Sequence, residues 1–133
     1  MATRILLDTN VYAAWKKGHA GVVARVRDAE GVLFSSVVAG ELLFGFRHGN
    51  RYQRNRAELE ALLDNPYVTL LPVTLETAER FGLIAAALRR KGKAIPTHDL
   101  WVAAHAMESG AELLSFHGHF EAVEGLLWSD PSG

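Results

Sequence analysis

Short apolar runs with β-strand character alternate along this chain with helical segments of about ten residues or more. Strands that are separated by helices pair in parallel, because a parallel pair needs a long crossover connection. The alternation therefore predicts an α/β fold, in which helices cover both faces of a central, mostly parallel sheet of four to five short strands. The strands are expected at Arg4–Leu7, Val32–Phe34, Val68–Val73, Glu112–Ser115 and, at the sheet edge, Leu126–Trp128.

Polar residues that make good helix caps precede the expected helices. Thr9 or Asn10 is expected to cap the first helix, Thr74 the longest one, and Thr97 the helix that precedes the strand at Glu112–Ser115. The expected helices run from Thr9 or Asn10 to about Lys17, from 22 to 29, from Ser35 or Ser36 past Glu41, from 51 to 63, from 74 to 92, from 97 to about 109, and briefly after Phe120.

The composition is that of an ordinary globular protein, with 49% hydrophobic and 22% charged residues. We expect the whole chain, residues 1–133, to form one domain. The chain has no cysteine, which excludes disulfides, thiolate metal sites and thiol nucleophiles. No stretch approaches the roughly 18 apolar residues of a membrane span, and the N-terminus lacks a signal-peptide core. We therefore expect a soluble, cytoplasmic protein with no membrane partner.

Three acidic residues lie far apart in the chain, each at or inside a hydrophobic element. Asp8 follows the apolar run Ile5–Leu7, Glu41 lies inside an apolar helix, and Asp99 precedes Leu100–Ala104. A carboxylate beside a buried element costs free energy unless it is paired or binds a metal. Because ligands collect at the carboxyl ends of parallel strands, these acids are expected to converge there. Convergent carboxylates suit a hard divalent cation, Mg²⁺ or Mn²⁺.

Each of these acids also has a purely structural explanation. Asp8 could end its strand or cap the next helix, and Glu41 could face solvent on one side of its helix. Asp99 stands in the first turn of its helix, where the helix dipole favours an acidic side chain. Considered one by one, the residues leave both explanations open.

The cations are clustered, although the net charge is only −1. Residues 42–57 contain four arginines and no acid, and residues 80–98 contain five Lys or Arg residues and no acid. Either stretch could be solvated helix surface. Both lie beside expected site acids, however, and a basic rim around an acidic centre suits a site that brings a phosphate backbone to a metal. The arginines expected to contact the substrate are Arg47, Arg51 and Arg54.

Four strings of residues resemble, in order, the motifs of the PIN domain. They cover essentially the whole chain, and its length is similar to that of VapC-type toxins from bacterial toxin–antitoxin pairs. A single string would be a weak match, whereas four in order over one small domain form a strong one. The strings are Leu6–Asn10, Ser35–Gly45, Ile95–Ala106 and Glu112–Phe120.

The resemblance implies a PIN-like α/β/α sandwich and a divalent-metal-dependent endoribonuclease, the toxin of a type II pair. Asp8, Glu41 and Asp99 would hold Mg²⁺ or Mn²⁺, with Asp8 and Asp99 as direct ligands, and a metal-activated water would cleave the RNA phosphodiester bond. The resemblance also implies a cognate VapB-like antitoxin and a homodimer, which would form a heterotetramer or larger assembly with that antitoxin. Polar neighbours expected to contact the substrate are Thr9, Asn10 and Ser115.

The fourth string departs from the family pattern. Two residues after the Ser or Thr, where the family usually has an acid, this chain has His117. A neutral imidazole there could contact a metal, water or phosphate, so His117 is counted among the catalytic candidates. The alternative function is a catalytically impaired PIN-like module that binds RNA or a protein partner without efficient cleavage. For His98 and His105 a structural role is expected.

Overall fold

Five strands form the centre of the computed structural model, which describes residues 3–132. Their order is β3-β2-β1-β4-β5, and every neighbouring pair runs in parallel. The expected mostly parallel sheet of four to five strands is therefore confirmed. The strands are β1 (Arg4–Leu7), β2 (Gly31–Ser35), β3 (Val68–Leu71), β4 (Glu112–Leu114) and β5 (Trp128–Ser129).

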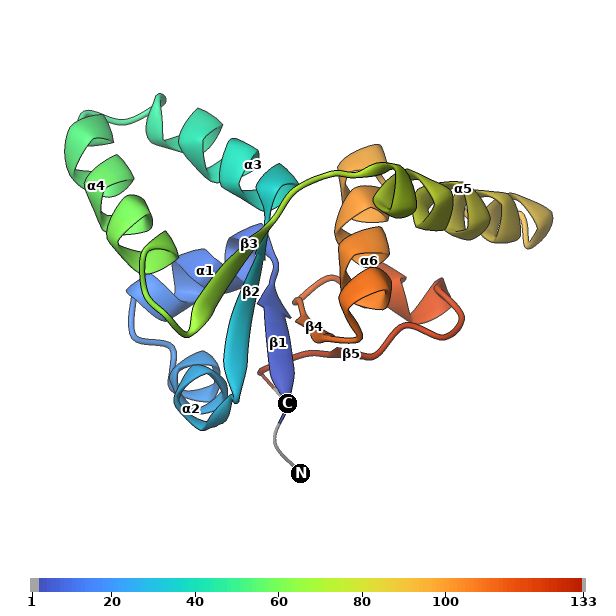
Figure 1. The fold of residues 1–133 in the computed structure, drawn as a ribbon, viewed down its shortest axis with the longest axis horizontal. Helices are drawn as coiled ribbons and strands as arrows, with labels where there is room; N and C mark the ends of the chain where they lie inside the picture. Colours follow the sequence, from blue (N-terminus) through green and yellow to red (C-terminus); the bar gives the residue numbers. More distant parts are fainter. Residues whose placement is uncertain (1–2, 133) are drawn as a thin grey trace.

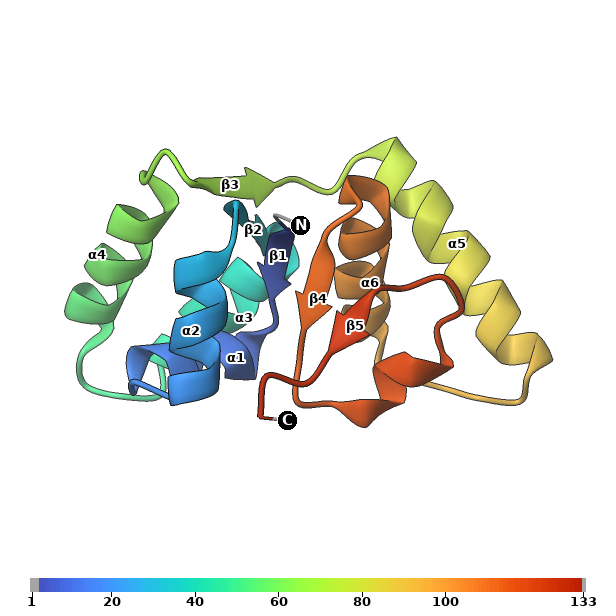
Figure 2. The same ribbon diagram turned by 90° about the horizontal axis from the view of Figure 1, so that it is seen from below.

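Helices flank the sheet on both sides. In Figure 1 and Figure 2, α1 and α2 lie on one side of the strands, and α5 and α6 lie on the other. The helices are α1 (Thr9–Lys16), α2 (Ala20–Asp28), α3 (Ser36–Phe46), α4 (Tyr52–Leu63), α5 (Leu75–Arg90), α6 (Thr97–Ser109) and the short 3-10 helix η1 (Gly118–Ala122). Within residues 3–132, no helix has the length and apolar character needed to cross a membrane.

Two of the expected helix caps are wrong. Asp8, rather than Thr9 or Asn10, is the N-cap of α1, and its Oδ1 accepts a hydrogen bond from the Thr9 backbone N–H at 2.9 Å. Pro96, rather than Thr97, stands at the cap position before α6. Proline suits that position because its fixed φ is compatible with the extended residue before a helix, and because it has no N–H to satisfy.

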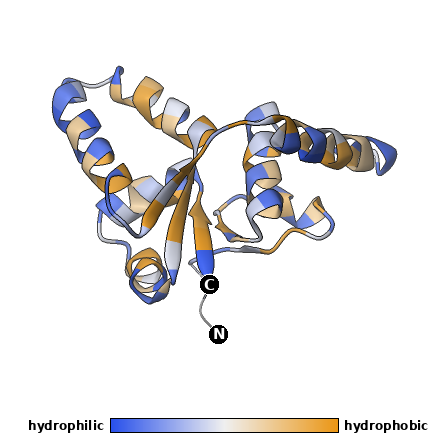
Figure 3. Cartoon of the chain, in the orientation of Figure 1, coloured by the Kyte–Doolittle hydropathy of each residue, from blue (hydrophilic) through white to orange (hydrophobic). Residues whose placement is uncertain are grey.

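The central strands are buried on both faces. Ile5, Leu6 and Leu7 of β1 are at most 1% exposed, and Phe34 of β2 and Leu113 of β4 are fully buried. Figure 3 colours these strands as mostly hydrophobic, whereas the helices alternate between hydrophobic and hydrophilic residues. A strand that is covered on both faces needs such a continuous apolar run. Each buried side chain of this size contributes roughly 1.5–3 kcal/mol to folding.

The carboxyl ends of the parallel strands meet at one edge of the sheet. Asp8 follows β1, Ser35 ends β2 directly before α3, and Ser115 follows β4. The Asp8 backbone N–H donates to the Leu114 carbonyl at 3.0 Å, which extends the pairing of β1 with β4 to this edge. Trp128 of β5 reaches the same place, because its Nε1 donates to the Ser115 carbonyl at 3.1 Å. The topology thus brings Asp8 and Trp128, which are near opposite ends of the described chain, to one edge of the sheet.

Candidate active site

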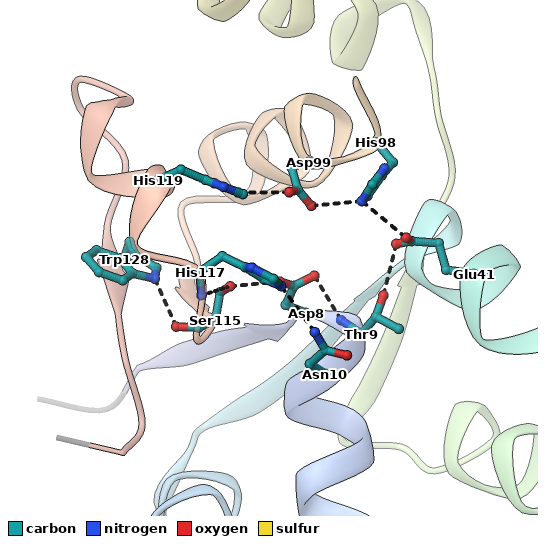
Figure 4. A network of polar contacts seen from close by, with 10 residues as sticks. All are labelled: Asp8, Thr9, Asn10, Glu41, His98, Asp99, Ser115, His117, His119 and Trp128. Atoms are coloured by element: carbon teal, nitrogen blue, oxygen red, sulfur yellow. Dashed lines mark hydrogen bonds and ion pairs between the residues drawn. The ribbon is translucent and has the colours of Figure 1, made fainter. Parts of the chain in front are cut away.

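Asp8 lies at the centre of the polar cluster at this edge, and its side chain is held by both neighbouring segments (Figure 4). The residue is only 3% exposed. Its Oδ1 accepts from the Thr9 backbone N–H at 2.9 Å, and its Oδ2 accepts from the Ser115 hydroxyl at 2.7 Å. Ser115 is fully buried and also accepts from the His117 N–H at 3.0 Å. Ser115 therefore orients the Asp8 carboxylate from the buried side of the cluster and does not face solvent.

Glu41 reaches the cluster from α3. The hydroxyl of Thr9 donates to Glu41 Oε1 at 2.9 Å, so the first turn of α1 holds one oxygen of this carboxylate. The other oxygen, Oε2, lies 3.4 Å from Nε2 of His98. These two contacts explain why an acidic residue can stand in the middle of the apolar helix α3.

Asp99 lies in the first turn of α6 and is 4% exposed. Burial raises the pKa of its carboxyl above the ordinary value, and the negative charge of Asp8 raises this pKa further. Three imidazoles, those of His98, His119 and His117, act in the opposite direction. The contribution of Asp8 means that the two carboxylates lie close enough to repel each other.

Two histidines that the sequence analysis did not include in the site contact these acids. His98 Nε2 lies 3.4 Å from both Glu41 Oε2 and Asp99 Oδ1, so its ring bridges α3 and α6. His119 Nε2 lies 2.8 Å from Asp99 Oδ2, yet this buried nitrogen has no hydrogen-bond partner within residues 3–132. Asp99 therefore contacts the His119 ring without the alignment of a hydrogen bond. In the sequence, the position of His98 directly before Asp99 is the feature that could have placed it in the site.

His117 lies at the rim of the cluster and is exposed. The side-chain amide of Asn10 donates to His117 Nε2, with a distance of 3.1 Å between the two nitrogens. The His117 ring also stacks on His119, with centroids 5.3 Å apart and planes 10° from parallel. Asn10 and His117 thus form one border of the site.

The arginines expected to contact the substrate are not part of the network in Figure 4. The guanidinium of Arg47 stacks over the ring of Tyr52 at 3.6 Å, and Arg54 pairs with Glu58 at 3.2 Å. Arg51 directly precedes α4 and is exposed. In Figure 2 the turn between α3 and α4 and the loop between α5 and α6 lie at the same edge of the molecule as the end of β1.

The donor set at this edge fits a divalent cation in its chemistry. Three carboxylates and the imidazoles of His98, His117 and His119 meet there, and these are ligand types that divalent ions accept. In their present conformations, however, no three His, Asp or Glu side chains of the described residues are placed to hold one ion together. Glu41 and Asp99 contact histidines instead. In this conformation Glu41 and Asp99 therefore face imidazoles rather than one another.

Comparison with known proteins agrees with this architecture. The PIN domain family model matches residues 5–126. Ribonuclease VapC2 of Haemophilus influenzae is 32% identical over 114 residues, which are 84% of this chain and 85% of that protein. The tRNA(fMet)-specific endonuclease VapC of Shigella flexneri is 29% identical over 130 residues, which are 96% of this chain and 97% of that protein.

A solved structure, that of DNA-bound VapBC from Salmonella typhimurium, is similar with a TM-score of 0.81 and 26% identity. The similarity covers 98% of this chain and 99% of that one. The matched region of the family model contains Asp8, Glu41, Asp99 and His117. This chain belongs to the PIN-domain family, among the VapC ribonucleases.

Proposed function

We propose that this protein is a divalent-metal-dependent endoribonuclease and the toxin of a type II toxin–antitoxin pair. The observation that carries the proposal is the connected network of Figure 4, which contains Asp8 from the junction of β1 and α1, Glu41 from α3 and Asp99 from α6. PIN-domain ribonucleases generally require a divalent metal ion. Mg²⁺ or Mn²⁺ is the ion that such an oxygen-rich site prefers.

Asp8, Glu41 and Asp99 would hold the ion, and their neighbours would set the geometry. When bound, the ion would supply an acidified water and would stabilise negative charge on the phosphate. Ser115 and the Thr9 N–H fix both oxygens of Asp8, so this carboxylate stays aimed at the site. The Thr9 hydroxyl fixes Oε1 of Glu41 and leaves Oε2 for another partner. With the acids used as ligands, no protein base is needed.

The substrate side of the site is polar and basic. Asn10 and His117 border the acids and offer an amide and an imidazole to a phosphate or a water. Arg47 and Arg51, from the turn between α3 and α4, would contact the RNA backbone. Unpaired regions of RNA suit an open site of this kind. The name of the Shigella flexneri relative makes initiator tRNA the first defined substrate to test.

A second function rests on one specific observation. His117 stands where the family usually has an acid, and it already has a partner in Asn10. A site that lacks one negative charge binds a hard cation more weakly. The protein would then bind RNA or a protein partner without efficient cleavage. Titration with Mn²⁺ in the presence of a structured RNA separates the two functions, because only the nuclease produces new RNA ends.

The partner of the proposed toxin is a VapB-like antitoxin, and the solved relative from Salmonella typhimurium is itself a VapBC complex. A homodimer and a cytoplasmic location belong to the same proposal.

A cavity of about 450 Å³ offers a place for apolar side chains of the antitoxin. Its apolar lining comes from α1, α2, β2, α4 and β3, through Trp15, Val26, Val32, Leu62 and Val68. Val68→Glu should weaken co-purification with the antitoxin, whereas Leu83→Glu on exposed α5 should not.

The nuclease function is tested by mapping RNA ends. Purified protein is incubated with total RNA and with initiator tRNA, in Mg²⁺ or Mn²⁺ and in EDTA. Asp8→Asn should lower the cleavage rate by more than about 100-fold, since the loss of an outer partner of a metal ligand already costs 10- to 100-fold. Asp64→Asn is the matched control, because Asp64 is exposed at the end of α4. Equal cleavage by both variants, or cleavage that persists in EDTA, would contradict the proposal.

A further inference from the structure

His105 is a buried imidazole to which the proposed mechanism gives no task. It lies in the middle of α6 and is fully buried. Its Nδ1 lies 2.8 Å from the Ser35 hydroxyl oxygen, and its Nε2 lies 3.0 Å from the Pro72 carbonyl oxygen. A buried imidazole costs free energy unless both nitrogens have partners. Here both are satisfied, and by segments that are distant in the chain.

The partners determine where the protons are. The Pro72 carbonyl can only accept, so His105 Nε2 carries a hydrogen and donates it. The Ser35 hydroxyl oxygen accepts from the Val37 backbone N–H at 3.1 Å, which leaves its own hydrogen for His105 Nδ1. One neutral tautomer therefore satisfies every polar atom of this chain of contacts. We call the set Ser35, His105 and Pro72 the buried relay.

The buried relay joins the two helices that carry Glu41 and Asp99. Ser35 is the N-cap of α3, the helix of Glu41, and His105 lies on α6, the helix that begins beside Asp99. The third member, Pro72, follows β3 and fixes the linker that leads to α5. A hydrogen bond between fully buried groups has little freedom to change length, because close packing surrounds both partners. The distance between the start of α3 and the body of α6 is thereby set.

We propose that the buried relay positions Glu41 against Asp99, so that His105 and Ser35 tune metal binding without touching the metal. This inference rests on the proposed metal-dependent function. Ser35 acts through the first turn of α3, whose Val37 N–H it caps, and Glu41 follows in the same helix. Both residues are positioning residues, since neither contacts the substrate.

The test is a double-mutant cycle on the affinity for Mn²⁺, followed by the electron paramagnetic resonance signal of free Mn²⁺. Ser35→Ala should weaken Mn²⁺ binding by roughly tenfold, as expected for a partner that orients a metal ligand. In a Glu41→Gln background, Ser35→Ala should cause no further loss, because the relay acts through Glu41. Where Glu41→Gln binds too weakly to titrate, the cleavage rate at one fixed, subsaturating Mn²⁺ concentration is used in the same cycle.

Ser109→Ala is the matched control. Ser109 lies on the same helix as His105, but its hydroxyl donates only to α6 carbonyls, those of His105 and Ala106. Its removal should leave Mn²⁺ affinity unchanged. A second relay variant, His105→Phe, should weaken Mn²⁺ binding and speed hydrogen exchange of the Val37 amide in the metal-free protein. His105→Gln, which keeps a donor for Pro72, should restore part of the affinity.

The possible results separate the two proposals. If wild type binds Mn²⁺ and Ser35→Ala loses no more affinity than Ser109→Ala, the relay has no positioning role and the nuclease function stands. If the loss in Ser35→Ala persists in the Glu41→Gln background, the relay is only a structural support, and the inference is equally overturned. If wild type neither binds Mn²⁺ nor cleaves RNA, the proposed function fails and this inference fails with it.

Discussion

Replacement of Ser115 by alanine should destabilise the metal-free protein far more than an ordinary surface hydroxyl deletion. The Ser115 hydroxyl donates to Asp8 Oδ2 at 2.7 Å and accepts from the His117 N–H at 3.0 Å. Both Ser115 and Asp8 are almost fully buried. The variant would leave a buried carboxylate oxygen and a backbone N–H without these partners, and water has little access to replace them.

The magnitude follows from these two contacts. A hydrogen bond to a charged group contributes about 1.5–3 kcal/mol, and a neutral one about 1 kcal/mol. Ser115→Ala should therefore lower the unfolding free energy by roughly 2–4 kcal/mol. For a chain of 133 residues, each kcal/mol shifts the unfolding midpoint by about 3–4 °C. The expected fall in Tm is roughly 6–16 °C.

Thermal unfolding followed by circular dichroism in EDTA measures this fall. Ser129→Ala is the control, because the Ser129 hydroxyl donates to Glu112 Oε2 at the same 2.7 Å. Ser129 and Glu112 are only partly buried, and Arg25 remains as a partner of Glu112. The control should therefore cost about 1 kcal/mol or less. Equal shifts in Tm for the two variants would refute the reasoning, since they would mean that burial does not set the strength of these bonds.

Three further outcomes are expected. Asp99→Asn should stabilise the metal-free protein near neutral pH, because burial and the Asp8 charge raise the pKa of Asp99 above its ordinary 3.8. The unfolding free energy of the wild type then falls as the pH rises from about 3.8 through the folded-state pKa of Asp99, whereas that of the variant does not. Urea denaturation in EDTA at pH 4 and pH 7 measures this difference. Equal pH dependence of the two proteins would contradict the prediction. His117→Asp should tighten Mg²⁺ or Mn²⁺ binding in calorimetry, because it adds a carboxylate to the site; unchanged affinity would make His117 a bystander. Arg47→Gln combined with Arg51→Gln should weaken RNA binding in EDTA and reduce the slope of log affinity against log salt by roughly 1.4, whereas Arg27→Gln, an exposed arginine paired with Asp28, should leave the slope unchanged.

The strands could be predicted because burial on both faces requires a continuous run of apolar residues, which is visible in the sequence. β1 had to be apolar throughout, and its predicted range, Arg4–Leu7, is the observed one. The order of the strands could not be predicted in the same way. The central place of β1 between β2 and β4 depends on backbone pairing, which apolar runs do not encode. At the start of α1 the sequence left two possibilities open, a cap by Asp8 or one by Thr9 or Asn10, and the structure has Asp8 as the cap.

The histidines show where reasoning from the sequence ends. His98 and His105 share a helix face by spacing, and the same structural role was expected for both. In the structure the side chain of His98 is 49% exposed and contacts Glu41 and Asp99, whereas His105 is fully buried against Ser35. The difference arises because the first turn of α6 lies at the sheet edge, whereas His105, about two turns later, packs against the start of α3. Such a difference depends on how α6 is placed against α3, and helical spacing does not encode this placement.

The order in which the sheet is assembled has a consequence for synthesis of the chain. Asp8 and Ser115, which share a hydrogen bond, are 107 positions apart, and β1 lacks one neighbour until β4 has emerged from the ribosome. At about 5–20 residues per second, this interval lasts on the order of 5–20 s. During that time the nascent chain can form β1, β2 and β3 but cannot form the Ser115 contact to Asp8. The ribosome that makes this protein is therefore not exposed to the complete acidic cluster around Asp8 until Ser115 has been translated.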